Sequence, residues 1–267
     1  MSVGSDSQYS PPEPIQSTAA PGRSAKACRL GLVAAAVSTL LSAAEPVGEQ
    51  DRVRWLGEMR HIAVLAPSTA ASGAPLLLVL GDPGRSARYA LESWRELAER
   101  EGFVVAAVSS ADAGVWRIPQ DGPGLLRAVV QRMNSRHQVD PRRVYLFGAG
   151  LGGGFALLMA VLQPQYFAAV ASFGAEPQAG ALGVDPLARA LPVRIYYSKR
   201  TPQFDVDALQ QAAASLRESG AEVEVERLDV GPAFERQGHK AAGRIWAALS
   251  SHALSEGPRY RSTPYGG

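Results

Sequence analysis

The sequence predicts an α/β protein with one domain built on a doubly wound, mostly parallel sheet. First, apolar β-type runs alternate with helical patterns through most of the 267 residues. Second, the run 103–108 is apolar throughout, which is typical of a strand buried on both faces. Third, the apolar run 144–147 leads into a glycine cluster and then into an apolar helical pattern. Sheets of this class carry their sites at such turns, along the carboxyl edge.

The strands are predicted from short runs of apolar residues bounded by turn-forming residues. These runs cover residues 61–65, 76–80, 103–108, 144–147, 167–172, 193–197 and 222–228. The last run alternates charged and apolar residues, so we expect a strand with one face in solvent.

The helices are predicted from apolar residues that recur three or four positions apart. They are expected over residues 90–98, 125–133, 155–162, 206–219 and 242–249. Gly102 and Gly220 are expected to end two of them, because glycine adopts the backbone angles of a helix stop. Asp205 is the expected N-cap of the helix 206–219.

The domain is expected to span residues 50–254. Residues 1–22 are rich in Ser, Pro and Gln and are predicted to be a disordered leader. Residues 255–267 are predicted to be a loose tail.

Residues 23–44 have the pattern of a signal peptide. Basic residues precede a mostly apolar run, 30–44, which ends in small residues. The run is too short to cross a membrane comfortably, so no membrane association is expected beyond a signal segment. This pattern favours export to the periplasm or the outside of the cell. The alternative is an Ala-rich helix packed on the domain of a cytoplasmic protein.

The composition excludes several classes of function. A net charge of +2 is too small to indicate a nucleic-acid partner. The single cysteine, Cys28, cannot form a disulfide within the chain, and the four histidines lack the spacing of metal ligands. We therefore expect no metal and no cofactor.

The glycine cluster allows two interpretations. Read as the G-x-S-x-G turn that carries the nucleophile of some hydrolases, Gly148 to Gly152 has Gly150 where the serine belongs. Read as the G-x-G-x-x-G turn of dinucleotide-binding domains, Gly148, Gly150 and Gly153 match. The choice between these turns decides which chemistry the sequence predicts.

The residues around the turn resemble one family. Residues 139–145, the glycine turn and residues 164–170 resemble the α/β-hydrolases, most closely the polyhydroxybutyrate-depolymerase and feruloyl-esterase type. The resemblance extends more weakly over about residues 60–252. It implies the α/β-hydrolase fold and a triad of nucleophile, acid and histidine.

The resemblance also implies which residues stand at the triad positions. Gly150 stands at the nucleophile position, Thr201 at the acid position and His239 at the histidine position. Glycine has no group that can attack a carbonyl, and threonine carries no charge to stabilise an imidazolium. Only His239 is retained, so the resemblance implies a degenerate esterase. The alternatives are that Gly150 relieves a strained turn and that His239 simply begins the last helix.

An oxyanion loop is implied in the same way. Gly81 and Asp82 follow an early central strand, and the backbone N–H of Leu151 follows the nucleophile position. By itself Asp82 is expected on an exposed loop, as are Trp116 and Asp121.

Three functions follow from this reading. The favoured one is a non-catalytic hydrolase-fold protein that binds a small molecule or a protein at the former active-site face. The first alternative is a carboxylesterase with a non-standard constellation that uses Ser198 or a serine at 109–110. The second is a nucleotide-binding protein that uses the three glycines. Against it, the nearest candidate for the acidic ribose partner, Glu176, comes too late in the chain.

Overall fold

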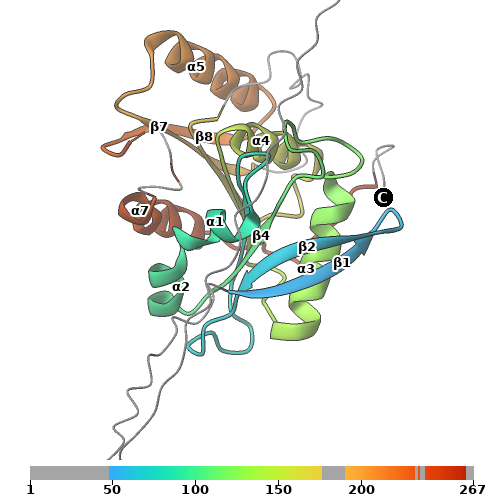
Figure 1. Cartoon of the computed structure of the whole chain (residues 1–267). Helices are drawn as coiled ribbons and strands as arrows, with labels where there is room; N and C mark the ends of the chain where they lie inside the picture. The colour runs from blue at the N-terminus through green and yellow to red at the C-terminus, as the bar shows by residue number, and fades with distance from the viewer. Residues whose placement is uncertain (1–47, 176–189, 232–233, 235–237, 263–267) are drawn as a thin grey trace, which may run out of the picture. The chain divides into compact units, whose positions relative to one another are not determined.

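One mixed sheet organises the described part of the chain. The computed structural model describes residues 48–175, 190–231, 234 and 238–262 (Figure 1). The predicted leader, the signal-like segment and Glu176 lie outside these residues. The strands are β1 (Glu49–Trp55), β2 (Glu58–Leu65), β3 (Leu76–Leu80), β4 (Val104–Val108), β5 (Val144–Ala149), β6 (Ala169–Phe173), β7 (Pro192–Ser198) and β8 (Glu222–Leu228).

The strand order confirms the predicted fold class. The sheet runs β1-β2-β4-β3-β5-β6-β7-β8. The pairs β1–β2 and β2–β4 are antiparallel, and every pair from β4 to β8 is parallel. Strand β1 was not predicted, because this partly exposed edge strand carries mainly polar and charged side chains and lacks an apolar run.

The helices are α1 (Ala87–Glu92), α2 (Arg95–Glu101), α3 (Pro123–His137), α4 (Leu151–Leu162), α5 (Gln203–Glu218) and α7 (His239–Ser250). The single helix predicted over 90–98 is two helices, because α1 ends at Glu92, with Ser93 as its C-cap, and α2 starts after the fully buried Trp94. Asp205 is not an N-cap, since α5 begins earlier and Pro202 holds that position. The carbonyl of Pro202 accepts from the N–H groups of Asp205 and Val206.

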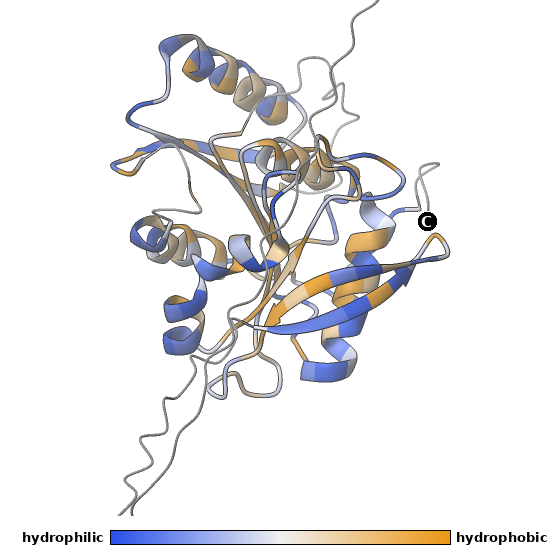
Figure 2. Ribbon diagram, in the orientation of Figure 1, coloured by the Kyte–Doolittle hydropathy of each residue, from blue (hydrophilic) through white to orange (hydrophobic). Residues whose placement is uncertain are grey.

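The helices cover both faces of the sheet. Helices α3, α4 and α5 pack on one face, and α1, α2 and α7 pack on the other (Figure 1). Side chains of a single strand alternate between the two cores, as in β3, where Leu78 faces the first and Leu77 the second. Figure 2 shows apolar residues along the central strands and in α4, and a mixture of polar and apolar residues on the other helices. This burial on both faces explains why β3 and β4 are apolar throughout.

The segment after α7 contacts the domain over residues 255–262. Gln163 and the backbone of Arg261 exchange two hydrogen bonds, of 2.6 and 2.8 Å. The ring of Tyr260 packs against Tyr166 and lies 4.5 Å from the guanidinium carbon of Arg127. The prediction of a loose tail is therefore wrong for these residues, which gain their order from contacts far along the chain.

None of the helices in the described ranges has both the length and the apolar character needed to cross a bilayer.

An ion-pair cluster fixes β1 to α3. The carboxylate of Asp51 accepts from Arg132 at 2.8 and 2.9 Å and lies 3.1 Å from Arg136. The hydrogen bonds from Arg132 hold the pKa of Asp51 well below its usual range. A lowered carboxyl pKa contributes stability above the unfolded pKa and loses it as the pH falls toward the folded value.

We expect Asp51→Asn to lower the free energy of unfolding by about 1 to 3 kcal/mol at neutral pH, because it removes charge-assisted hydrogen bonds. The deficit should shrink as the pH falls below about 4, where the wild-type carboxyl starts to lose its advantage. Urea unfolding across the acid range measures this. Glu224→Gln, which alters an exposed partner of Arg194, is the control and should change little. A deficit that is constant with pH would contradict the role of the charge.

Candidate functional site

The turn at Gly150 is as sharp as the sequence predicts. Strand β5 ends at Ala149 and α4 begins at Leu151, so one residue joins them at the carboxyl edge of the sheet. Gly150 has φ +54° and ψ −127°, a conformation that residues with a side chain rarely adopt. Its N–H donates to the carbonyl of Phe173 on β6 at 3.0 Å. The turn is therefore held against the neighbouring strand.

The flanking glycines allow strand and helix to pack closely. A Cβ on Gly148 would lie 2.1 Å from the carbonyl oxygen of Gly152. A Cβ on Gly152 would lie 2.3 Å from the carbonyl oxygen of Leu80 on β3. Close backbone approach accounts for both glycines without a phosphate ligand.

Asp82 fills the space beside Gly150. Its Oδ1 accepts from the N–H of Leu151 at 3.1 Å, and a Cβ on Gly150 would lie only 2.0 Å from the same oxygen. Asp82 is half-buried, so its placement on an exposed loop is wrong. The structure does bring Gly81, Asp82 and Leu151 together, as the predicted oxyanion loop requires. Here, however, the N–H of Leu151 already donates to the carboxylate of Asp82, which belongs to the same loop.

Trp116 contacts the loop of Gly81 and Asp82. The side chain is 6% exposed, its Nε1 donates to the carbonyl of Gly81 at 3.1 Å, and its ring stacks on Phe155 of α4. The expectation that Trp116 is exposed is therefore wrong. Residues 109–121 show no regular spacing, so the sequence carries no signal for this contact.

Asp121 is also buried, contrary to expectation. It has no exposed surface, and its carboxylate accepts from the N–H groups of Ala111 and Arg117, each at 2.9 Å. Arg60 on β2 pairs with it at 2.8 Å and also donates to the carbonyls of Ser109 and Gln120. One buried ion pair thus organises the loop that carries Trp116.

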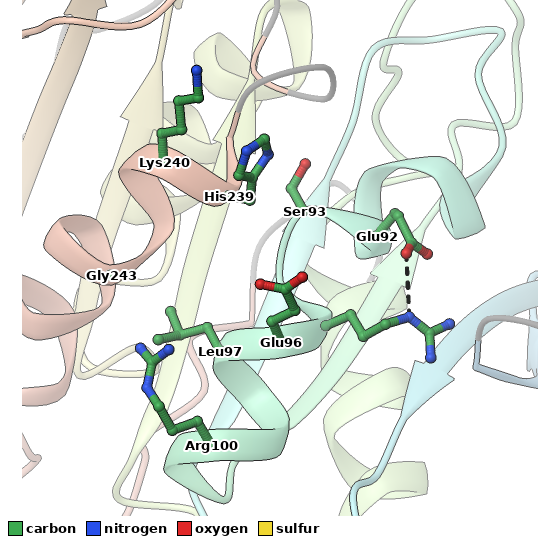
Figure 3. Close-up of a pocket in the computed structure, with 9 residues that line it drawn as sticks. Glu92, Ser93, Glu96, Leu97, Arg100, His239, Lys240 and Gly243 are labelled. Carbon is green, nitrogen blue, oxygen red and sulfur yellow. Dashed lines mark hydrogen bonds and ion pairs between the residues drawn. The ribbon is translucent and has the colours of Figure 1, made fainter.

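His239 lies in a separate pocket. It is the first residue of α7, is exposed and lines a cavity of about 360 Å³ between α7 and α1–α2 (Figure 3). Charged side chains also line the cavity, among them Glu96, Arg100 and Lys240. Glu92, which also lines the cavity, pairs with Arg95. Gly150 and Asp82 are not among the residues that line this cavity.

Thr201 lies in another pocket, at the carboxyl ends of β6 and β7. Its Oγ1 accepts from the N–H of Ser198 at 3.1 Å. The cavity has a volume of about 440 Å³, and its lining includes the apolar Phe173 and Leu209 and the charged Arg200 and Asp205. Among the described residues, the cavities of Thr201 and His239 share no lining residue.

The serines considered as alternative nucleophiles bond to their own surroundings. The buried hydroxyl of Ser198 donates to the carbonyl of Val230 at 2.7 Å and accepts from the N–H of Arg200. Ser109 Oγ accepts from the N–H of Ala87 at 2.9 Å, and Ser110 Oγ donates to the carbonyl of Asp112. These contacts hold loops in place, and none of them involves a histidine.

Within the described ranges, no three His, Cys, Asp or Glu side chains gather as a metal site would require.

Comparison with known proteins identifies relatives among esterases. Residues 111–252, more than half of the chain, match the Dienelactone hydrolase family. A bifunctional acetylxylan esterase/xylanase of Neocallimastix patriciarum is 33% identical over 39% of this chain and 16% of its own length. Poly(3-hydroxyalkanoate) depolymerase C of Paucimonas lemoignei is 31% identical over 43% of this chain and 30% of its own. The chain spans half or less of the length of the curated relatives it matches.

Solved structures share the fold. An S-formylglutathione hydrolase from Agrobacterium tumefaciens superposes with a TM-score of 0.61 at 13% identity, over 78% of this chain and 94% of the other. An esterase of Pyrobaculum calidifontis gives 0.59 at 15% identity, over 76% and 85%. The expected α/β-hydrolase fold and the resemblance to polyhydroxybutyrate depolymerases are thereby confirmed.

Proposed function

The chain belongs to the dienelactone hydrolase family, and from that premise we propose that it is a non-catalytic member that binds a small molecule at the former active-site face. In this proposal Gly150 replaces the nucleophile, Thr201 replaces the acid, and His239 is the retained histidine. The single observation that carries the proposal is the elbow at Gly150, which has the backbone of a nucleophile turn and no side chain.

Chemistry supports this proposal. Acyl transfer through a covalent intermediate needs a hydroxyl or thiol at the turn, activated by an adjacent base. Gly150 offers neither group, and the Asp82 carboxylate lies where such a group would stand. His239 lines a different cavity from Thr201. A hydrolase that keeps its oxyanion-hole donors but lacks its triad retains only a small part of its catalytic rate.

The proposed ligand site is the cavity beside Thr201. Its volume of about 440 Å³ falls within the range of about 300 to 1,000 Å³ that small-molecule pockets occupy. A lining that combines apolar side chains with the charged Arg200 and Asp205 suits a ligand with an apolar body and a polar group.

A carboxylesterase with a non-standard constellation is the second candidate, and the esterase names of the relatives favour it. Nucleotide binding has less support. A phosphate on the three-glycine turn would sit at the N-terminus of α4, where Asp82 already bonds to Leu151. Two anions at this place would repel each other.

We expect the wild-type protein to hydrolyse nitrophenyl acetate no faster than His239→Ala, because the elbow lacks a nucleophile. Initial rates at matched protein concentration measure this. A wild-type rate that falls with His239→Ala would overturn the proposal in favour of the esterase. A rate that survives His239→Ala but falls with Ser198→Ala or Ser109→Ala would place the catalytic site elsewhere.

Ligand binding is tested by a thermal-shift screen of short acyl compounds. Ala208→Phe, which puts a ring into the cavity, should abolish the shift of any compound that binds there. Ala214→Phe lies on an exposed part of the same helix and should leave the shift unchanged. Equal effects of both variants would contradict the cavity assignment.

A further inference from the structure

The position of Asp82 has a consequence for access to the elbow. A Cβ on Gly150 would lie 2.0, 2.9 and 3.1 Å from Oδ1, Cγ and Oδ2 of Asp82. The whole carboxylate thus fills the space of an elbow side chain, while Oδ1 takes the N–H of Leu151. We propose that Asp82 is an intramolecular plug, an autoinhibitory contact that keeps ligands from the elbow and from the Leu151 N–H. This deepens the proposed function, because it concerns the same former active-site face.

Hydrogen bonds hold the backbone at Asp82 and at the preceding Gly81. The carbonyl of Gly81 accepts from Trp116, and the carbonyl of Asp82 accepts from the N–H of Arg85 at 3.2 Å. Gly84 approaches the 109–121 loop so closely that a Cβ there would lie 2.7 Å from the carbonyl oxygen of Ala113. With the backbone held, the elbow opens by rotation of the Asp82 side chain and not by movement of the loop.

The charge of Asp82 also favours the closed arrangement. The first N–H groups of a helix carry partial positive charge and attract anions. Leu151 is the first residue of the twelve-residue helix α4, and its N–H points at the Asp82 carboxylate. The Asp82 carboxylate is therefore held by electrostatic attraction to the N-terminus of α4 as well as by its fit. An external anion that binds there must displace this carboxylate, which is also negatively charged.

A double-mutant cycle on thermal stability tests the contact. Gly150→Ala should lower the melting temperature of the wild type, because the new methyl group meets Asp82 and the backbone has positive φ. In an Asp82→Ala background the collision is gone, so the same change should cost fewer degrees. Gly220→Ala is the matched control for positive φ, since Gly220 has φ +96° and a Cβ there would meet nothing within 4 Å. Its cost should be the same in both backgrounds. Equal costs of Gly150→Ala in the two backgrounds would overturn the plug.

Formate tests whether removing the carboxylate opens the space. The melting temperature of Asp82→Ala should rise with formate concentration at constant ionic strength, with chloride as the reference salt. That of the wild type should not rise, and the double variant with Gly150→Ala should respond less than Asp82→Ala. A rise in the wild type equal to that in Asp82→Ala, or no rise in Asp82→Ala, would show that Asp82 does not close the elbow. These readouts are independent of ester hydrolysis, so failure of the plug and failure of the proposed function are distinguishable.

Discussion

Replacing Asp121 by alanine is expected to lower the free energy of unfolding by about 3 to 5 kcal/mol, because it leaves the partly buried Arg60 without its counter-ion. The side chains of Asp121 and Arg60 are 0% and 11% exposed, so solvent can do little to replace the lost charge. The N–H groups of Ala111 and Arg117 would lose their acceptor as well. The measurement is equilibrium unfolding in urea.

Asp112→Ala is the matched control for this prediction. Asp112 pairs with Arg117 on the same loop, but its side chain is 42% exposed. Its loss should cost no more than about 1 kcal/mol. A similar cost for both variants would show that the buried pair does not organise the loop. Because Trp116 depends on this loop, Asp121→Ala should also change the near-ultraviolet circular dichroism.

Gly152→Ala is the second change with a large expected effect. The added Cβ would lie 2.3 Å from the carbonyl oxygen of Leu80 and 2.5 Å from that of Gly81. Backbone atoms of a central strand cannot rotate away, so α4 must shift from the sheet. We expect a loss of about 1 to 3 kcal/mol or more in the free energy of unfolding, as overpacking produces.

The control for this glycine is Gly243→Ala in α7. Gly243 is exposed, and a Cβ there would meet nothing within 4 Å. Alanine should therefore stabilise the helix by about 0.5 to 1 kcal/mol. Opposite signs for the two substitutions are the expected result. Tolerance of Gly152→Ala would contradict the close approach of α4 to β3.

Local pattern was sufficient for most of the elements. The apolar run of β3 and the alternating run of β8 were predicted with their observed bounds, because burial on both faces or on one face produces these patterns in the sequence. The turn at Gly150 was also predicted, since glycines between an apolar strand and an apolar helix leave few alternatives. Strand β1 was missed because an edge strand needs few apolar residues.

The candidate site was predicted only in part. The family resemblance named Gly81, Asp82 and Leu151 as one loop system, and they do lie together. It gave no reason to expect a carboxylate in the space beside Gly150. It also gave no reason to expect that Thr201 and His239 line different cavities.

The sequence by itself determined the fold class, the succession of strands and helices, and the absence of a nucleophilic side chain at Gly150, because each depends on the identity or the spacing of residues near one another. Only the tertiary structure decided that Asp82 fills the elbow, that Trp116 holds Gly81, and that Arg60 neutralises Asp121. These contacts join residues from different elements. Their distances follow from how α4, the 109–121 loop and the sheet pack together, and no local pattern in the chain records that packing.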